Sequence, residues 1–84
     1  MENGSLMPDD RLLEQLRAGD EQAFSQVVSE WSPMLLRLAM AHTPSRAVAE
    51  EVVQDTWVAV LGGIDRFEGR SSLRTWVISI LLNK

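Results

Sequence analysis

Three carboxylates close together in the middle of the chain are the first candidates for chemistry: Glu50, Glu51 and Asp55. Clustered carboxylates can bind a metal or move protons, but a di-iron site also needs Glu-x-x-His partners, and the chain has none. The single histidine and the absence of cysteine exclude zinc sites built on several imidazoles or on thiolates. No serine lies in a nucleophile motif, and no phosphate loop or dinucleotide fingerprint occurs. We therefore predict a protein that is not an enzyme and uses no cofactor or metal. A small helical enzyme built on this cluster stays open as an alternative.

The same stretch could instead bind a basic partner. One arc of a helical wheel is polar and carries two apolar side chains among its members: Glu50, Glu51, Gln54, Asp55, Val58 and Leu61. Charges on such an arc would steer the encounter, and the apolar side chains would supply a desolvated centre. The alternative is a solvated helix face with two isolated apolar residues, which are common on protein surfaces.

A second group of residues combines arginine, serine and aromatic side chains. A loop precedes the last helix, and that helix carries Arg74 and Trp76; the loop segment contains Arg66, Phe67, Gly69, Arg70, Ser71 and Ser72. Arginine and serine can bind phosphates or base edges, glycine allows close backbone approach, and an aromatic ring can stack an unpaired base. The alternative is a capped helix start whose Phe67 and Trp76 belong to the core. For Trp76, which lies on the main apolar stripe, the core reading is favoured.

The elements that must position these residues are all helical. Apolar residues recur three and four positions apart, and no strand-like alternation occurs. We expect helices over about 9–18, 20–42 and 44–61 and from residue 73 onward, with a short turn or helix over 64–67. The predicted fold is therefore an all-α bundle of four to five helices over residues 9–84, preceded by a disordered start over residues 1–8.

Single residues refine this expectation. Asp20 and a serine before the last helix should cap helix starts, while Gly19 and the pair Gly62-Gly63 should end helices. Pro33 lies inside the second apolar stripe and predicts a kink or a short break near Ser32. His42 continues that stripe and is expected to be half-buried.

Composition and charge fit one soluble domain. The chain has 84 residues, 45% apolar and 24% charged, and a net charge of −4. Residues 64–84 nevertheless carry +2, from four bases against two acids. This asymmetry suggests either two partners of opposite charge or chance clustering. No apolar run is long enough to cross a bilayer and no signal peptide opens the chain, so we expect a cytoplasmic protein without membrane insertion.

Three segments together resemble a known family. Residues 18–24 (AGDEQAF) resemble the GD-x-x-AF opening of sigma-70 family factors of the extracytoplasmic-function (ECF) group. Residues 49–57 (AEEVVQDTW) resemble their AED-x-VQ-(D/E)-T-F segment, and residues 67–76 (FEGRSSLRTW) their F-x-G-x-SSLRTW segment. Asn83 matches a terminal asparagine. The segments occur in the family's order, and the resemblance covers roughly residues 9–84.

The resemblance implies the second sigma domain, region 2, which binds RNA polymerase and opens the promoter −10 element. It implies that one group of residues faces the clamp helices of the polymerase β′ subunit: Glu50, Glu51, Gln54, Asp55 and Val58. It implies that another group faces the −10 DNA, where the loop captures a base flipped from the non-template strand: Arg66, Phe67, Gly69, Arg70, Ser71, Ser72, Arg74 and Asn83. Anti-sigma factors commonly bind this domain, so one is a possible further partner.

The sequence departs from the family in two respects. Where the family has arginines and an aromatic after the tryptophan, this chain has Ser79, Leu82 and Ile78. Fewer cations predict weaker and less salt-sensitive DNA binding, and exposed Ile78 and Leu82 could dock on another protein. A sigma-like interaction module therefore stays open as an alternative. The family also continues into a domain that reads the −35 element, which is absent from this chain.

Overall fold

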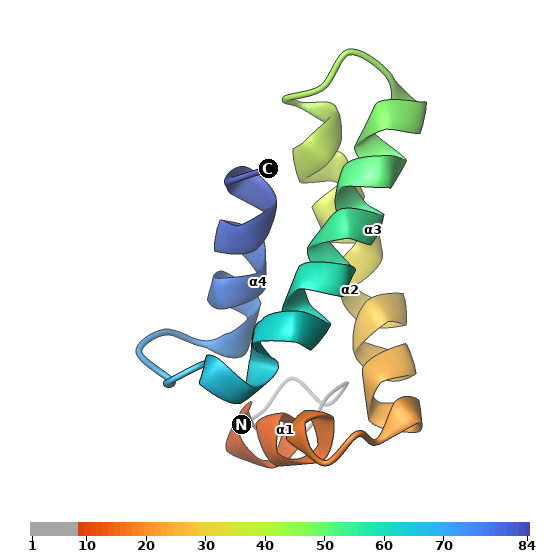
Figure 1. Cartoon of the computed structure of the whole chain (residues 1–84). Coiled ribbons are helices and arrows are strands. Elements are labelled where there is room, and N and C mark those ends of the chain that lie inside the picture. The colour runs from red at the N-terminus through yellow and green to blue at the C-terminus, as the bar shows by residue number, and fades with distance from the viewer. Residues whose placement is uncertain (1–8) are drawn as a thin grey trace, which may run out of the picture.

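The computed structural model describes residues 9–84 as a small helical bundle (Figure 1). Its elements are α1 (Asp9–Arg17), α2 (Glu21–Met40), α3 (Arg46–Gly63), the short 3-10 helix η1 (Ile64–Arg66) and α4 (Leu73–Leu82). These described residues contain no strand. The predicted all-α fold is confirmed, whereas the expected disordered start over residues 1–8 lies outside the described part of the chain.

Short side chains cap three helices where the sequence turns polar. Asp20 accepts a hydrogen bond from the backbone N–H of Ala23 at 3.1 Å, and Ser72 accepts one from that of Thr75 at 3.1 Å. Ser45 caps α3 in the same way. Each cap satisfies one of the N–H groups that a helix start leaves free. The capping predicted for Asp20 and for a serine before the last helix is therefore confirmed.

α2 passes through Pro33 as one continuous helix, so of the predicted kink or short break near Ser32 the break does not occur. Proline removes one backbone hydrogen bond, but tertiary packing on both sides holds the helix together. Val27 and Leu35, on either side of Pro33, are 1% and 0% exposed. Ser32 also accepts a hydrogen bond from the Trp57 indole Nε1 of α3 at 3.0 Å. These contacts favour the helical path over a break.

Two predicted helix ends differ from the structure. α3 includes Gly62 and Gly63 and leads directly into η1, which buries Ile64 to 5% exposure. Burial of that side chain favours continued helical turns over an end at the glycines. α2 ends at Met40, so His42 lies in the following turn and is exposed rather than half-buried.

α3 is the centre of the bundle. α2 and α4 lie along it, and α1 crosses the end at which α2 begins and α3 ends (Figure 1). Side chains from every element form one core, whose largest fully buried apolar members are Leu12, Val27, Leu35, Val60, Leu73 and Val77. Phe24 packs edge-to-face on Trp57, with ring centroids 5.9 Å apart. Because the core takes up one side of α3, the opposite side is left for other contacts.

Among residues 9–84, no helix is both long enough and apolar enough to cross a lipid bilayer.

Candidate functional site

The outer face of α3 carries the residues predicted to bind polymerase. Five inward side chains fix the orientation of the helix: Ala49, Val53, Thr56, Trp57 and Val60 are all buried. The opposite side is exposed at every predicted position: Glu50, Glu51, Gln54, Asp55 and Val58. Val58 is 68% exposed and Leu61, one turn further, is 57% exposed. The helix thus presents an acidic stripe with an apolar end.

The carboxylates of this acidic stripe differ in their neighbours. Glu50 accepts from Arg46 Nε at 3.0 Å, one helical turn away, and both side chains are more than half exposed. Within residues 9–84, no cation forms an ion pair with Glu51 or Asp55. The negative potential of the stripe therefore centres on Glu51 and Asp55, which leaves them available to a cationic partner.

A groove of about 530 Å³ runs beside the stripe between α2 and α3. Glu50 and Gln54 line one side of it, and Ser29, Pro33 and Leu36 line the other. The sequence interpretation assigned no role to these three α2 residues. The available signal was Pro33 inside the predicted helix, because a proline leaves one backbone carbonyl of the preceding turn without its helical hydrogen bond.

Every residue of the loop over residues 68–72 is exposed. Gly69 has φ +77°, a left-handed conformation that side-chain-bearing residues seldom adopt. Glu68 and Arg70 form an ion pair at 3.0 Å across this glycine, although the Arg70 side chain is still 87% exposed. The hydroxyl of Ser71 donates to the Ser72 carbonyl at 3.1 Å, while the Ser72 hydroxyl serves as the α4 cap. The loop thus offers solvent a guanidinium, a serine and an accessible backbone.

Phe67 was predicted to face DNA, but its ring is only 8% exposed and packs on Trp76 with centroids 4.9 Å apart. Both rings line a hollow of about 310 Å³ together with Ala59, Gly63, Arg66 and Ile80. Gly63 allows this arrangement because an added Cβ would lie 3.3 Å from the Trp76 ring. Phe67 therefore acts mainly as a support beneath the loop. The sequence interpretation assigned neither Gly63 nor Ile80 to a site, because their place beside Phe67 depends on how α3 and α4 pack.

The remaining predicted DNA-facing residues lie at the end of η1 and at the two ends of α4. Arg66 and Arg74 are exposed near the two ends of the loop. Asn83 is exposed as well, but its amide Nδ2 donates to the Ser79 carbonyl at 2.9 Å and so closes the end of α4.

Of the two apolar side chains expected to be exposed on the far side of α4, only one is exposed. Leu82 is 55% exposed, as predicted, whereas Ile78 is half-buried and packs against the core. The sequence interpretation treated α4 as having a single core stripe, but neighbouring elements cover more of this helix than that stripe accounts for.

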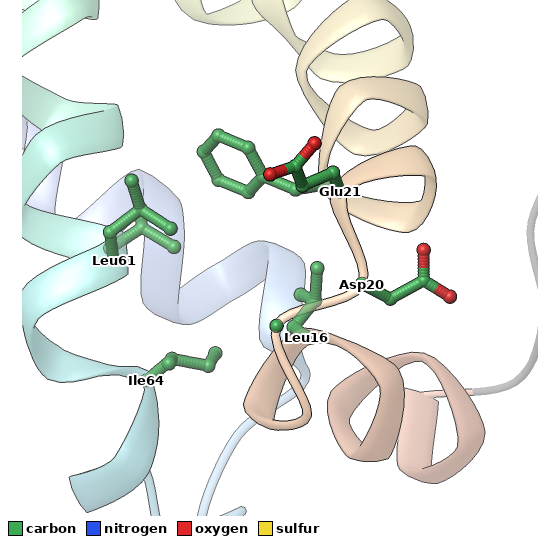
Figure 2. A pocket seen from close by; sticks show the side chains of 8 residues that line it. Leu16, Asp20, Glu21, Leu61 and Ile64 are labelled. Atoms are coloured by element: carbon green, nitrogen blue, oxygen red, sulfur yellow. The ribbon is translucent and has the colours of Figure 1, made fainter.

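A small apolar pocket of about 210 Å³ lies where α1, α2 and α3 meet, and Leu16, Leu61 and Ile64 are among its lining residues (Figure 2). Glu21 and Asp20 are its only charged lining residues. No group of three or more histidine, aspartate or glutamate side chains gathers anywhere in residues 9–84 in a way that could hold a metal.

Comparisons with known proteins agree on one family. A family model described as Sigma-70 region 2 matches residues 27–84. The RNA polymerase sigma factor NccH of Alcaligenes xylosoxydans xylosoxydans is 30% identical over 76 residues, which are 90% of this chain and 41% of that protein. The ECF RNA polymerase sigma-E factor of Escherichia coli (strain K12) is 30% identical over 77 residues, 92% of this chain and 40% of that protein. The chain thus spans about two fifths of the length of these relatives.

A solved structure is similar throughout. It is the NMR structure of the complex formed by an engineered region 2 of sigmaE with GTAAAA. The similarity has a TM-score of 0.81 at 25% identity and covers 99% of this chain and 84% of that one.

Proposed function

The chain belongs to the sigma-70 region 2 family, and from this premise we propose that it binds the RNA polymerase core and recognises and melts the promoter −10 element. One observation carries the proposal: an acidic stripe on α3, whose Glu51 and Asp55 form no ion pair among the described residues, and an arginine-bearing loop before α4 are exposed on different elements of the same fold. Their opposite charges suit a basic protein surface and a nucleic acid respectively.

On the polymerase side, the acidic stripe docks on the basic clamp helices of the β′ subunit. Glu51 and Asp55 supply charge, Gln54 supplies hydrogen bonds, and Val58 supplies apolar contact. The adjoining groove beside Pro33 gives a neighbouring helix further surface to cover. Charge steers such an encounter, and the desolvated apolar centre supplies most of its affinity.

On the DNA side, the loop over residues 68–72 holds one base extruded from the non-template strand. Arg66, Arg70 and Arg74 bind the flanking phosphates, while Gly69 lets the backbone approach the base. Extrusion costs a few kcal/mol of unstacking and unpairing, which the loop contacts and the trapped single strand offset. The domain thus works by binding alone and performs no covalent chemistry of its own.

These partners imply a cytoplasmic protein. An anti-sigma factor that covers the same surfaces stays a prediction from the family resemblance, with exposed Leu82 as one apolar contact available to it.

The proposal is tested by pulling down a β′ clamp fragment with this chain. Gln54→Ala and Asp55→Ala should each lower the amount of fragment captured, because they remove exposed polar contacts without touching the core. Glu14→Gln, which removes one negative charge from the exposed face of α1, serves as the matched control. Equal capture by all four proteins would count against polymerase binding through α3.

A second candidate is a sigma-like interaction module with little DNA binding. It is favoured by Ser79, which stands where the family has an arginine, and by the exposed side chain of Leu82. The two candidates differ in whether a −10 single strand binds at low salt in the presence of polymerase. Binding there supports the sigma function, and its absence supports the interaction module.

A further inference from the structure

α1 forms hydrogen bonds with the backbone on both sides of the loop over residues 68–72. Near the end of the helix, Arg17 donates from Nε to the Ile64 carbonyl oxygen at 3.1 Å and from Nη2 to the Phe67 carbonyl oxygen. At the start of the helix, Asp9 accepts through Oδ2 from the Leu73 N–H at 2.8 Å. The bonded residues are 47, 50 and 64 positions apart in the sequence. One short helix therefore holds the backbone where the loop begins and where it ends.

The loop has no comparable bonds of its own. Glu68 pairs with Arg70, and the hydroxyls of Ser71 and Ser72 bond to Ser72 and Thr75. No hydrogen bond or ion pair of the described structure joins residues 68–72 to a residue outside 68–76. The path of the loop therefore depends on how its two ends are held.

Apolar packing alone would fix where the two ends of the loop lie but would leave their backbone free to change orientation. Phe67 and Leu73 are 8% and 1% exposed, which fixes their position in the core. Hydrogen bonds add direction, and bonds to charged groups are stronger than bonds between neutral ones. The Leu73 N–H is one of the donors at the start of α4 that have no acceptor within the helix, and Asp9 supplies that acceptor. The negative charge of Asp9 is also favourable at this end of the helix dipole.

We propose that Asp9 and Arg17 are positioning residues that hold the loop over residues 68–72 in the shape that captures the extruded nucleotide. The inference rests on the proposed DNA-binding function, since these residues act through the loop and do not touch the base. Preorganisation of a loop raises affinity by removing the entropy cost of ordering it on binding. Loss of the hydrogen bonds of either Asp9 or Arg17 should therefore weaken DNA binding while leaving the acidic stripe of α3 unchanged.

The test uses four variants of this chain and two matched controls. Arg17→Gln and Asp9→Ala remove the bonds, whereas Asp9→Asn keeps an oxygen that can accept from Leu73. Arg17→Lys keeps the charge, but its single ammonium lacks the planar fork that spans two carbonyl groups. Arg11→Gln and Asp10→Ala make the same charge changes at exposed positions of the same helix. Three quantities are measured for each protein: amide hydrogen exchange of residues 68–72, affinity for the oligonucleotide GTAAAA, and capture of the β′ clamp fragment.

Arg17→Gln and Asp9→Ala are expected to speed amide exchange in the loop and to lower GTAAAA affinity by about tenfold, with clamp capture unchanged. Asp9→Asn should largely restore both loop properties, Arg17→Lys should not, and the controls should match the original chain. Unchanged loop exchange in Arg17→Gln and Asp9→Ala would overturn the positioning role alone. A loss of clamp capture equal to the loss of GTAAAA binding would also overturn it, because the weaker DNA binding would then come from general unfolding and not from the loop. Failure of the original chain to bind GTAAAA at low salt, even in the presence of polymerase, would overturn the proposed function and the positioning role with it.

Discussion

The backbone conformation of Gly69, and not a lack of space, limits which residues can replace it. Its φ is +77°, and an added Cβ would meet no atom within 4 Å. Gly69→Ala should therefore cost about 1 kcal/mol, the usual strain of a side-chain-bearing residue in the left-handed region. Gly69→Asn should cost less, because asparagine tolerates that region better. Thermal unfolding of the three proteins measures this order, and equal stability of Ala and Asn variants would contradict it.

Ser32 supplies the partner of a buried indole. Its Oγ accepts from Trp57 Nε1 at 3.0 Å, which joins α2 to α3 beside Pro33. Ser32→Ala leaves the indole N–H without that partner and should destabilise the fold by about 1–2 kcal/mol. Denaturant unfolding measures the loss, with Ser25→Ala at an exposed position of α2 as the control. If both variants unfold alike, the Ser32 hydrogen bond contributes nothing to stability.

At this scale the sequence predicts whatever is decided locally. The caps at Asp20 and Ser72 were foreseeable because a capping side chain bonds a backbone N–H only a few residues away. The exposure of His42 was not, since it depends on α2 ending at Met40. The burial of Phe67 depends on its packing against Trp76, which lies in a different helix.

Among the elements, α3 shows how far an apolar pattern determines a candidate site. Its buried stripe fixes its rotation, and the polar arc read from the sequence is the arc that solvent reaches. Val48 lies four positions before Val52, on the apolar side of the helix, yet it is 36% exposed because it lies in the first turn, beyond the packed part of the helix. The pattern thus gave the face of the helix correctly and its ends less well.

The ion pair within α3 predicts unequal roles for neighbouring carboxylates. Glu50 is partly neutralised by Arg46, whereas Glu51 has no such partner among the described residues. Glu51→Gln should therefore weaken binding to the β′ clamp fragment more than Glu50→Gln does, by several-fold at low salt. Titrations at two salt concentrations measure the difference, which should shrink at the higher one. A stronger effect of Glu50→Gln would indicate that the groove beside α2, and not the charge, dominates the contact.

α1 marks the limit of prediction for whole elements. Its length and its end before Gly19, which has a left-handed conformation, follow from its own residues. Its hydrogen bonds with the loop do not, because they join residues 47 to 64 positions apart and no local pattern encodes such pairs. The sequence could therefore identify the loop as a candidate site but not the helix that holds it.

For the molecule as a whole, the distribution of charge matters more than its sum. If the proposed function holds, a chain of net charge −4 must approach DNA, which is itself negatively charged, and the +2 segment over residues 64–84 favours that approach. The exposed residues of the α3 stripe belong to a different element from the arginines of this segment, so a basic partner could cover the acidic side chains while DNA meets the arginines. Binding of polymerase should consequently remove part of the repulsion that the free chain exerts on DNA.

The salt dependence of DNA binding tests how many cations take part. Each phosphate contact to a single strand contributes a slope of about −0.7 in log affinity against log salt, so three arginines predict about −2. Ser79→Arg with Leu82→Arg should steepen the slope by about −1.4, since two further cations would reach the strand. Both positions are exposed, and Ser79 gives up only a hydroxyl bond to the Trp76 carbonyl of its own helix.

Titration of GTAAAA at several salt concentrations measures these slopes, with Arg37→Gln, at an exposed position near the end of α2, as the control that should change neither. A steeper slope together with higher affinity at low salt would indicate that this chain binds DNA weakly because it lacks cations along α4, and not because its loop has a different shape. An unchanged slope would indicate that positions 79 and 82 do not face the strand. In that case DNA contacts of this chain would be confined to the loop and to the first turn of α4.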